Sequence, residues 1–139
     1  MLSYCYTLLT GEVISATEIA GLDPDLGFLH SARWGRPALA LDLVEPWRPV
    51  LVDNTVLTLV RSGSIAPEDF LIDQDAGCRM SDKARKALLV AYERRLLTPA
   101  GSAEVRGKRP YRELLAEYAR GLADHLVDPT EEYGSYQWR

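Results

Sequence analysis

The segment Gly21–Arg48 constrains the fold of this chain most, because its glycines and prolines interrupt an otherwise helical pattern. Pro37 suits the first turn of a helix, where its missing N–H has no intrahelical acceptor. Pro46 and Pro49 then follow closely. Each lacks a backbone N–H and crowds the carbonyl four residues earlier, so the helix must end or kink between Glu45 and Pro49.

Outside this interruption, apolar residues recur at steps of three and four, which indicates amphipathic helices. A serine at position 81 suits a helix N-cap, and Phe70 to Met80 carries a weak hairpin signal around a polar centre. We therefore predict an all-α fold, a single helical domain of about six helices over residues 1–139 with a short β-hairpin as an option near residues 70–80. The expected helices cover residues 2–20, 37–45, 49–61, a short turn from 67, 82–97 and 110–126.

The composition fits one globular domain. A chain of 139 residues can bury a core, and 47% apolar with 26% charged residues excludes a disordered chain. No apolar run reaches membrane-spanning length and no signal peptide is recognisable, so we expect a cytoplasmic protein without a membrane partner. Cys5 and Cys78 lie far apart without metal-ligand spacing, and we expect both to be reduced, packed thiols.

The charges are divided along the chain. Residues 1–78 carry a net charge of −7, residues 79–120 a net charge of +6 and the remainder −3, within an overall charge of −4. A cationic part joined to an acidic part fits a protein that steers phosphates toward an ion. A solvated helix face is the alternative explanation of the same pattern.

Chemically reactive side chains gather in the interrupted segment. His30 ends a short irregular stretch, and Asp42 and Glu45 follow three residues apart in a helical run. Residues three apart share a helix face, so both carboxylates can point toward the histidine. One imidazole and two carboxylates form a mixed nitrogen and oxygen set suited to Mg²⁺ or Mn²⁺.

Three arginines, Arg33, Arg36 and Arg48, surround the same segment. The guanidinium group matches phosphate oxygens in charge and in geometry. Arginines beside a metal-type cluster therefore indicate a phosphate-bearing substrate.

The run LDPDLGFLHSARWGRPALALDLVEPWRPVLVD (Leu22–Asp53) resembles the signature of the CRISPR-associated integrase family. These proteins are metal-dependent nucleases that insert new spacers into CRISPR arrays. Shorter runs fall in the family's order along nearly the whole chain: LSYCYTLL at 2–9, EDF at 68–70, YERRL at 92–96 and YRELL at 111–115.

The resemblance implies a helical catalytic domain whose Mg²⁺ or Mn²⁺ ion is held by three residues. His30 and Glu45 fall on two of the three ligand positions, and Asp42 falls on a further acidic position close to the site. Arg33 and Arg36 match positions that tend to be basic and near DNA, and we predict that these two residues and Arg48 contact DNA. The implied reaction is a phosphoryl transfer, in which a DNA 3′-hydroxyl attacks a phosphodiester of the array.

The family's third ligand is a glutamate well upstream of the histidine, after an N-terminal β-rich domain. No residue before His30 resembles that glutamate, although Glu12 and Glu18 lie on the first expected helix. We therefore interpret residues 1–139 as the C-terminal catalytic domain alone, with weak metal binding and low activity in isolation. The implied partners are spacer and array DNA, the family's small ferredoxin-like partner and a second copy in a homodimer.

Two other functions remain open on the sequence. One is a non-catalytic DNA-binding or assembly module of the adaptation complex, whose DNA binding would need no metal. The other is a bare helical domain in which the acids and the histidine are structural.

Overall fold

The computed structural model describes residues 1–31, 33–73, 77–101, 107–130 and 133. Its α-helices in this part of the chain are α1 (Leu2–Ile19), α2 (Ala38–Val44), α3 (Asn54–Arg61), α4 (Asp82–Leu96) and α5 (Tyr111–Val127). Shorter helical turns are η1 (Glu45–Trp47), η2 (Arg48–Asp53) and η3 (Pro67–Asp69). The predicted helix positions are thus present in order.

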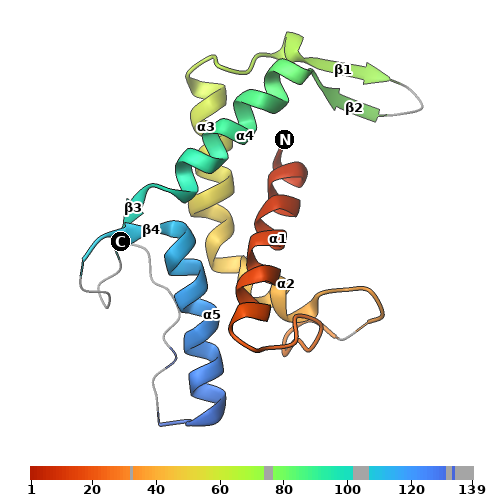
Figure 1. Ribbon diagram of the computed structural model, residues 1–139. Helices are drawn as coiled ribbons and strands as arrows, with labels where there is room; N and C mark the ends of the chain where they lie inside the picture. Colours follow the sequence, from red (N-terminus) through yellow and green to blue (C-terminus); the bar gives the residue numbers. More distant parts are fainter. Residues whose placement is uncertain (32, 74–76, 102–106, 131–132, 134–139) are drawn as a thin grey trace.

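Two small antiparallel strand pairs complete the fold (Figure 1). β1 (Phe70–Asp73) pairs with β2 (Gly77–Met80), where the optional hairpin was expected, and β3 (Pro99–Ala100) pairs with β4 (Arg109–Pro110). The prediction of an all-α domain of about six helices is therefore wrong, because the described residues combine five α-helices with these strands. Two-residue strands show no alternation of polar and apolar residues, so β3 and β4 leave no sequence signal.

Helix α1 lies against several other elements, and most of its contacts are with α5, α2 and η2 (Figure 1). Its buried side includes Cys5, Leu9 and Val13. Trp47 and Tyr92 are the largest side chains that are almost fully enclosed. Cys5 is packed as expected, whereas Cys78 is exposed on β2, so the prediction of two packed thiols holds only for Cys5.

The chain from α2 to α3 remains helical but changes its hydrogen-bond pattern twice. After α2 ends at Val44, η1 is a 3₁₀ turn and η2 a π-helical turn, and the backbone at Glu45 and Arg48 keeps right-handed helical angles. Pro46 and Pro49 lack the N–H groups that an α-helix would use, so the pattern shifts without a sharp turn. The predicted interruption therefore takes the form of a change in helix type.

The loop between α1 and α2 is held at both ends. Gly21 has φ +80°, and the amides of Gly21 and Leu22 donate to the carbonyls of Glu18 and Thr17, which form a Schellman motif. At the other end the carbonyl of Pro24 accepts the Leu39 amide at 2.8 Å and so caps the start of α2. The loop is thereby fixed across the N-terminus of α2.

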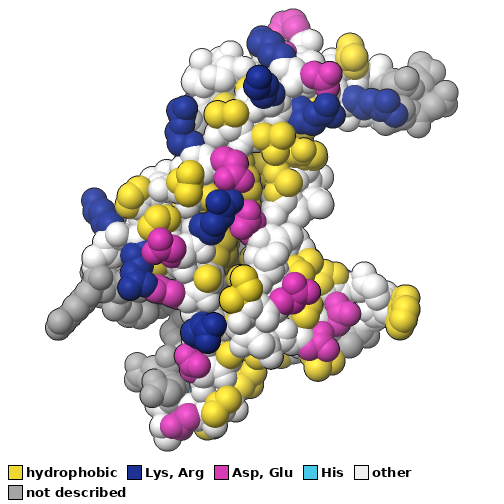
Figure 2. Space-filling view, viewed as in Figure 1, with side chains coloured by type: hydrophobic (Ala, Val, Ile, Leu, Met, Phe, Trp, Pro, Cys, Tyr) yellow, Lys and Arg dark blue, Asp and Glu magenta, His cyan; other side chains and the backbone are white. Residues whose placement is uncertain are grey.

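Charges are distributed unevenly over the surface (Figure 2). Lys and Arg side chains gather over α4 and the β1–β2 hairpin in the upper part of the view, while Asp and Glu gather around the loop between α1 and α2 at the lower right. This arrangement follows the division of charge along the sequence.

Candidate functional site

Asp42 lies at the centre of the candidate site. Asp42 lies on α2 and is only 6% exposed, and its carboxylate accepts hydrogen bonds from backbone N–H groups of the preceding loop. The donors are Phe28 at 2.8 Å, Leu29 at 2.9 Å and His30 at 3.0 Å. A carboxylate that accepts three backbone amides fixes the path of that segment, so Asp42 determines where His30 lies.

The imidazole of His30 also contacts Asp42. The His30 Nδ1 to Asp42 Oδ1 distance is 2.5 Å, and about a third of the His30 side chain is exposed. When Nδ1–H donates to the carboxylate, Nε2 keeps its lone pair for another partner. Asp42 thus orients His30 as a metal ligand or a proton acceptor.

The hydrogen bonds also shift the pKa of Asp42. Burial alone would raise this pKa, but bonds from the Leu29 amide, the His30 side chain and the Phe28 and His30 amides outweigh it and lower the pKa. Asp42 is therefore an anion at neutral pH. With four donors already bound to it, it acts by positioning the loop.

Gly27 allows the loop to approach α2 closely. A Cβ atom at this position would lie 2.8 Å from the Cβ and carbonyl carbon of Ala38 and from the carbonyl oxygen of His30. Such contacts are too short for any side chain, so only glycine fits before the Phe28–His30 segment. Sequence reasoning counted this glycine only among those that interrupt the helical pattern, and it missed the role of Gly27 in positioning His30.

Glu45 has a different environment from Asp42. Its side chain is about half exposed and forms an ion pair with Arg48, with Nη1 3.2 Å from Oε1. The Arg48 guanidinium also lies over the Tyr6 ring, 4.9 Å from its centroid, and the Tyr6 hydroxyl donates to Asp53 at 2.6 Å. The two acids three residues apart thus have separate partners, His30 for Asp42 and Arg48 for Glu45.

The described residues contain no group of three His, Cys, Asp or Glu side chains arranged to hold a metal ion. Of the three predicted residues, the ring nitrogen of His30 that Asp42 does not bond and the exposed carboxylate of Glu45 are donors of the kind that divalent ions bind. Asp42 is already bound to four hydrogen-bond donors. The predicted three-member cluster therefore divides into two candidate ligands and one residue that positions the first.

The other two predicted DNA contacts flank a tight turn. Arg33 and Arg36 pair as an isolated antiparallel bridge, with the Arg36 amide donating to the Arg33 carbonyl at 3.0 Å. Between them Trp34 is fully exposed, and Gly35 has the positive φ of +70° that the turn requires. Arg33 is exposed and Arg36 is half-buried, so this turn presents a cation close in sequence to His30.

Known proteins resemble this chain in sequence and in fold. Residues 1–94 match the model of the family described as CRISPR associated protein Cas1. A CRISPR-associated exonuclease Cas4/endonuclease Cas1 fusion from Rhodospirillum rubrum is 44% identical over 135 residues, which cover 97% of this chain and 23% of that protein. The CRISPR-associated endonuclease Cas1 1 of Moorella thermoacetica is 40% identical over 139 residues, covering 100% of this chain and 40% of that protein.

Among solved structures, a casposase bound to integration product has a TM-score of 0.86 and 26% sequence identity, and the match covers 100% of this chain and 40% of that one. The family match spans most of the chain, so this chain belongs to the Cas1 family of CRISPR associated proteins. It spans less than half the length of these relatives. None of the helices in the described part of the chain is long and apolar enough to cross a membrane.

Proposed function

We propose that residues 1–139 form the helical catalytic part of a DNA endonuclease and integrase that acts in CRISPR spacer acquisition. Membership of the Cas1 family and the endonuclease names of its relatives support this proposal. The observation that carries it is the His30–Asp42 pair, in which a buried carboxylate orients a part-exposed imidazole. A histidine held in this way is a common feature of metal sites.

In this proposal His30 and Glu45 hold Mg²⁺ or Mn²⁺, and a third ligand comes from outside the described residues. The ion would neutralise charge on the phosphate undergoing transfer. Asp42 keeps the His30 ring in the tautomer that is protonated on Nδ1, whose Nε2 has a free lone pair. Arg48 pairs with the Glu45 carboxylate in the absence of the metal ion, and the divalent ion would compete with Arg48 for that carboxylate.

Arg33 and Arg36 would contact DNA phosphates from the turn beyond His30, and Arg48 would do so once released from Glu45. The DNA-bound casposase of similar fold supports DNA as the substrate class. We further propose a homodimer, a small ferredoxin-like protein as partner, and action in the cytoplasm of a prokaryote.

A Mn²⁺ titration followed by thermal unfolding tests the metal part of this proposal. A ligand at 100 times its Kd stabilises the folded state by about 2.7 kcal/mol, so saturating Mn²⁺ should raise the Tm of the wild-type chain. His30→Ala and Glu45→Ala should each abolish the rise. His125→Ala, at the far end of α5, is the matched control and should retain it. An equal rise in all four proteins would sink the assignment of the ion to His30 and Glu45.

A second function has a specific observation in its favour. Because the described residues assemble no three-member ligand group, the chain could act as a non-catalytic DNA-binding or assembly module. In that case DNA binding would persist in EDTA, fall steeply with salt and show no effect of His30→Ala, and Mn²⁺ would leave the Tm unchanged.

A further inference from the structure

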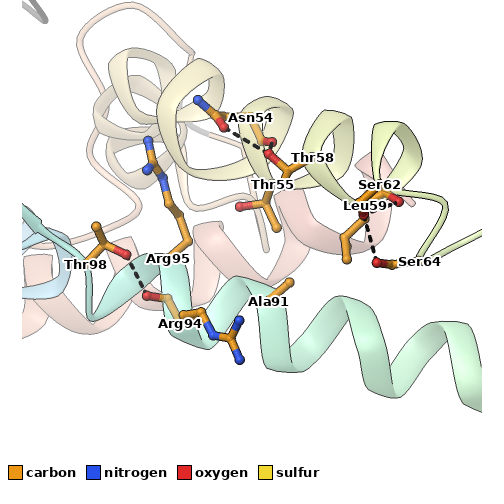
Figure 3. A pocket seen from close by; sticks show the side chains of 10 residues that line it. All are labelled: Asn54, Thr55, Thr58, Leu59, Ser62, Ser64, Ala91, Arg94, Arg95 and Thr98. Atoms are coloured by element: carbon orange, nitrogen blue, oxygen red, sulfur yellow. Dashed lines mark hydrogen bonds between the residues drawn. The ribbon is translucent and has the colours of Figure 1, made fainter.

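A groove runs between α3 and α4, formed by residues far apart in sequence (Figure 3). One end is a hollow of about 340 Å³, and a second hollow of about 410 Å³ extends it toward the start of α4. Both are lined by Leu59, Ser64, Ala91 and Arg94, so they form one continuous depression. We call it the α3–α4 groove.

The cations of the α3–α4 groove lie along α4. Lys83, Lys86, Arg94 and Arg95 line it, and no Asp or Glu is among its lining residues. Lys86 and Arg94 form no ion pair among the described residues, whereas Lys83 lies 3.7 Å from Asp69. A depression lined by four cations and no anion attracts an anionic ligand.

Arg95 has a structural role as well. Its Nε donates to the Val50 carbonyl at 2.9 Å, and its guanidinium lies 4.8 Å from the centroid of the Tyr111 ring. Figure 3 shows its side chain reaching from α4 toward the start of α3, at the end of the groove nearest Thr98. Lys86 and Arg94 are therefore the cations that remain free for a ligand.

The other lining groups are small and polar. Asn54, Thr58, Ser62 and Ser64 line the α3 side, and Thr98 closes the end nearest Arg95 (Figure 3). Thr58 donates to the Asn54 carbonyl at 2.7 Å and Thr98 to the Arg94 carbonyl at 2.8 Å. Since the two hydroxyl protons are used in these bonds, the threonine oxygens can serve a ligand only as acceptors, while the Asn54 side-chain amide adds N–H donors.

Apolar surface completes the lining. Leu59, Ala87, Val90 and Ala91 lie between the polar groups of α3 and the cations of α4. A ligand that matches all three kinds of surface carries repeated negative charge, apolar rings, and both donors and acceptors. A single-stranded nucleic acid has this combination, and proteins that bind it use a cationic groove that follows the backbone.

We propose that the α3–α4 groove binds a single strand of DNA, with phosphates on Lys86 and Arg94 and a base or sugar on Leu59 and Val90. The proposal rests on the DNA chemistry proposed above and adds a second contact surface, separate from the His30–Asp42 pair. The apolar lining at Leu59 and Val90 offers a contact to a base that is not already paired and stacked inside a duplex, so the lining favours a single strand.

The first test measures, by fluorescence anisotropy, the binding of a fluorescein-labelled oligo-dT of about 20 nucleotides to the full chain. The buffer contains EDTA, and the salt concentration is varied from about 0.05 to about 0.3 M. Lys86→Ala with Arg94→Ala removes two phosphate contacts. The slope of log K against log salt should fall by about 1.4, and affinity at 0.1 M salt by about 25-fold.

The matched control is Arg79→Ala with Arg85→Ala, which removes the same charge from two exposed residues outside the lining. It should weaken binding several-fold less than the groove variant. Equal weakening by both double variants would show diffuse attraction to the basic surface, and would overturn the proposal.

A steric test avoids charge altogether. Ser64 is exposed and lines both hollows, so Ser64→Trp should fill the junction without disturbing the core. It should reduce oligo-dT binding at least as much as the charge variant and leave binding of a 20-base-pair duplex unchanged. Unchanged oligo-dT binding would contradict the proposal, as would displacement of the oligonucleotide by poly-glutamate at equal charge concentration.

The metal proposal and the groove proposal can fail separately. His30→Ala should leave oligo-dT binding in EDTA unchanged, and the groove variants should retain the Mn²⁺-induced rise in Tm. If Mn²⁺ does not raise the Tm of the wild-type chain while the groove variants still weaken oligo-dT binding, the metal assignment alone fails. Intact metal binding with no difference between groove and control variants would remove the groove alone.

Discussion

At the scale of single residues, Asp42 decides the geometry of the candidate site. One buried carboxylate gathers three consecutive amides and one imidazole, while Phe28 and Leu29 keep their own side chains exposed. The segment has little apolar burial of its own to hold it. Its conformation therefore depends on hydrogen bonds to a charged acceptor, which are stronger than those to a neutral one.

Replacing Asp42 with Asn should lower the free energy of unfolding at pH 7 by about 1–3 kcal/mol, because the amide group keeps the shape but loses the charge and part of the acceptor capacity. Asp25→Asn, at an exposed position in the same loop, should change it by less than about 0.5 kcal/mol. Urea unfolding measures both. Equal effects of the two variants would show that Asp42 does not hold the loop.

The hydrogen bonds accepted by the Asp42 carboxylate should also make the stability of the folded chain depend on pH. The pKa of Asp42 is lower in the folded chain than its unfolded value of about 3.9, so its contribution is full above that value and is lost as the pH falls through the folded pKa. The difference between wild type and Asp42→Asn should therefore shrink below about pH 4. A difference that stays constant from pH 7 to pH 3 would contradict this assignment.

At the scale of elements, the helical run from α2 to α3 shows how two prolines shape the chain. They shift the hydrogen-bond pattern through η1 and η2, and a π-helical turn leaves backbone groups that need partners from elsewhere. Arg95 supplies one such partner from α4, since its Nε donates to the Val50 carbonyl in η2. The irregular turn is thus stabilised by a helix that follows it by about 45 residues in sequence.

Arg95→Met should lower the free energy of unfolding by about 1–3 kcal/mol, because it removes a charged donor from a part-buried carbonyl and the contact with the Tyr111 ring. Arg94→Met is the neighbouring control and should change stability by less than about 0.5 kcal/mol, as its exposed side chain has no ion pair in the described residues. Thermal unfolding compares the two, and a larger loss for Arg94→Met would contradict the role given to Arg95.

At the scale of the whole molecule, apolar packing around α1 holds the helices together and surface charge adds a smaller term. Leu9 on α1 and Leu114 on α5 are both fully buried. Arg112 on α5 also pairs with Glu12 of α1 at 3.0 Å and with Glu93 of α4 at 3.1 Å, so one side chain links three helices. These ion pairs lie at the surface, where water and salt weaken them.

Leu9→Ala should therefore cost about 2–5 kcal/mol of unfolding free energy, whereas Arg112→Gln should cost about 1 kcal/mol or less. The loss of unfolding free energy in Arg112→Gln should become smaller as the salt concentration rises from about 0.05 to about 0.5 M, and the loss in Leu9→Ala should not. Denaturant unfolding at the two salt concentrations measures both effects. An Arg112→Gln loss as large as that of Leu9→Ala would show that the ion pairs, and not the core, hold α1 to α5.

Much of the fold was predictable because its signals are local. The Ser81 hydroxyl accepts the Ala84 amide as an N-cap should, and α1, α4 and α5 lie within one or two residues of their expected ends. The β3–β4 pair was missed because its strands contribute two residues each and pair Pro99 with Pro110 and Ala100 with Arg109 across an intervening loop. The all-α prediction failed for this reason.

The candidate site was predictable in its residues but not in their roles. Pattern and resemblance selected His30, Asp42 and Glu45, while the structure pairs His30 with Asp42 and Glu45 with Arg48. Helical spacing predicts that the two acids share a face, but it does not record which partner each of them bonds. The close approach at Gly27 has no sequence signal beyond the glycine itself, since many glycines occupy turns for other reasons.

The sequence by itself determined the helices, the proline interruption, the family signature and the separation of charge, because each depends on residues near one another in the chain. Only the tertiary structure decided which ring nitrogen of His30 is occupied and which cations of α4 face α3 across a groove. Those features depend on residues distant in the chain: Asp42 bonds His30 across 12 positions, and Ser64 and Arg94 line the same groove although they are separated in sequence. Their distance in space is set by packing of the core, which no local pattern records.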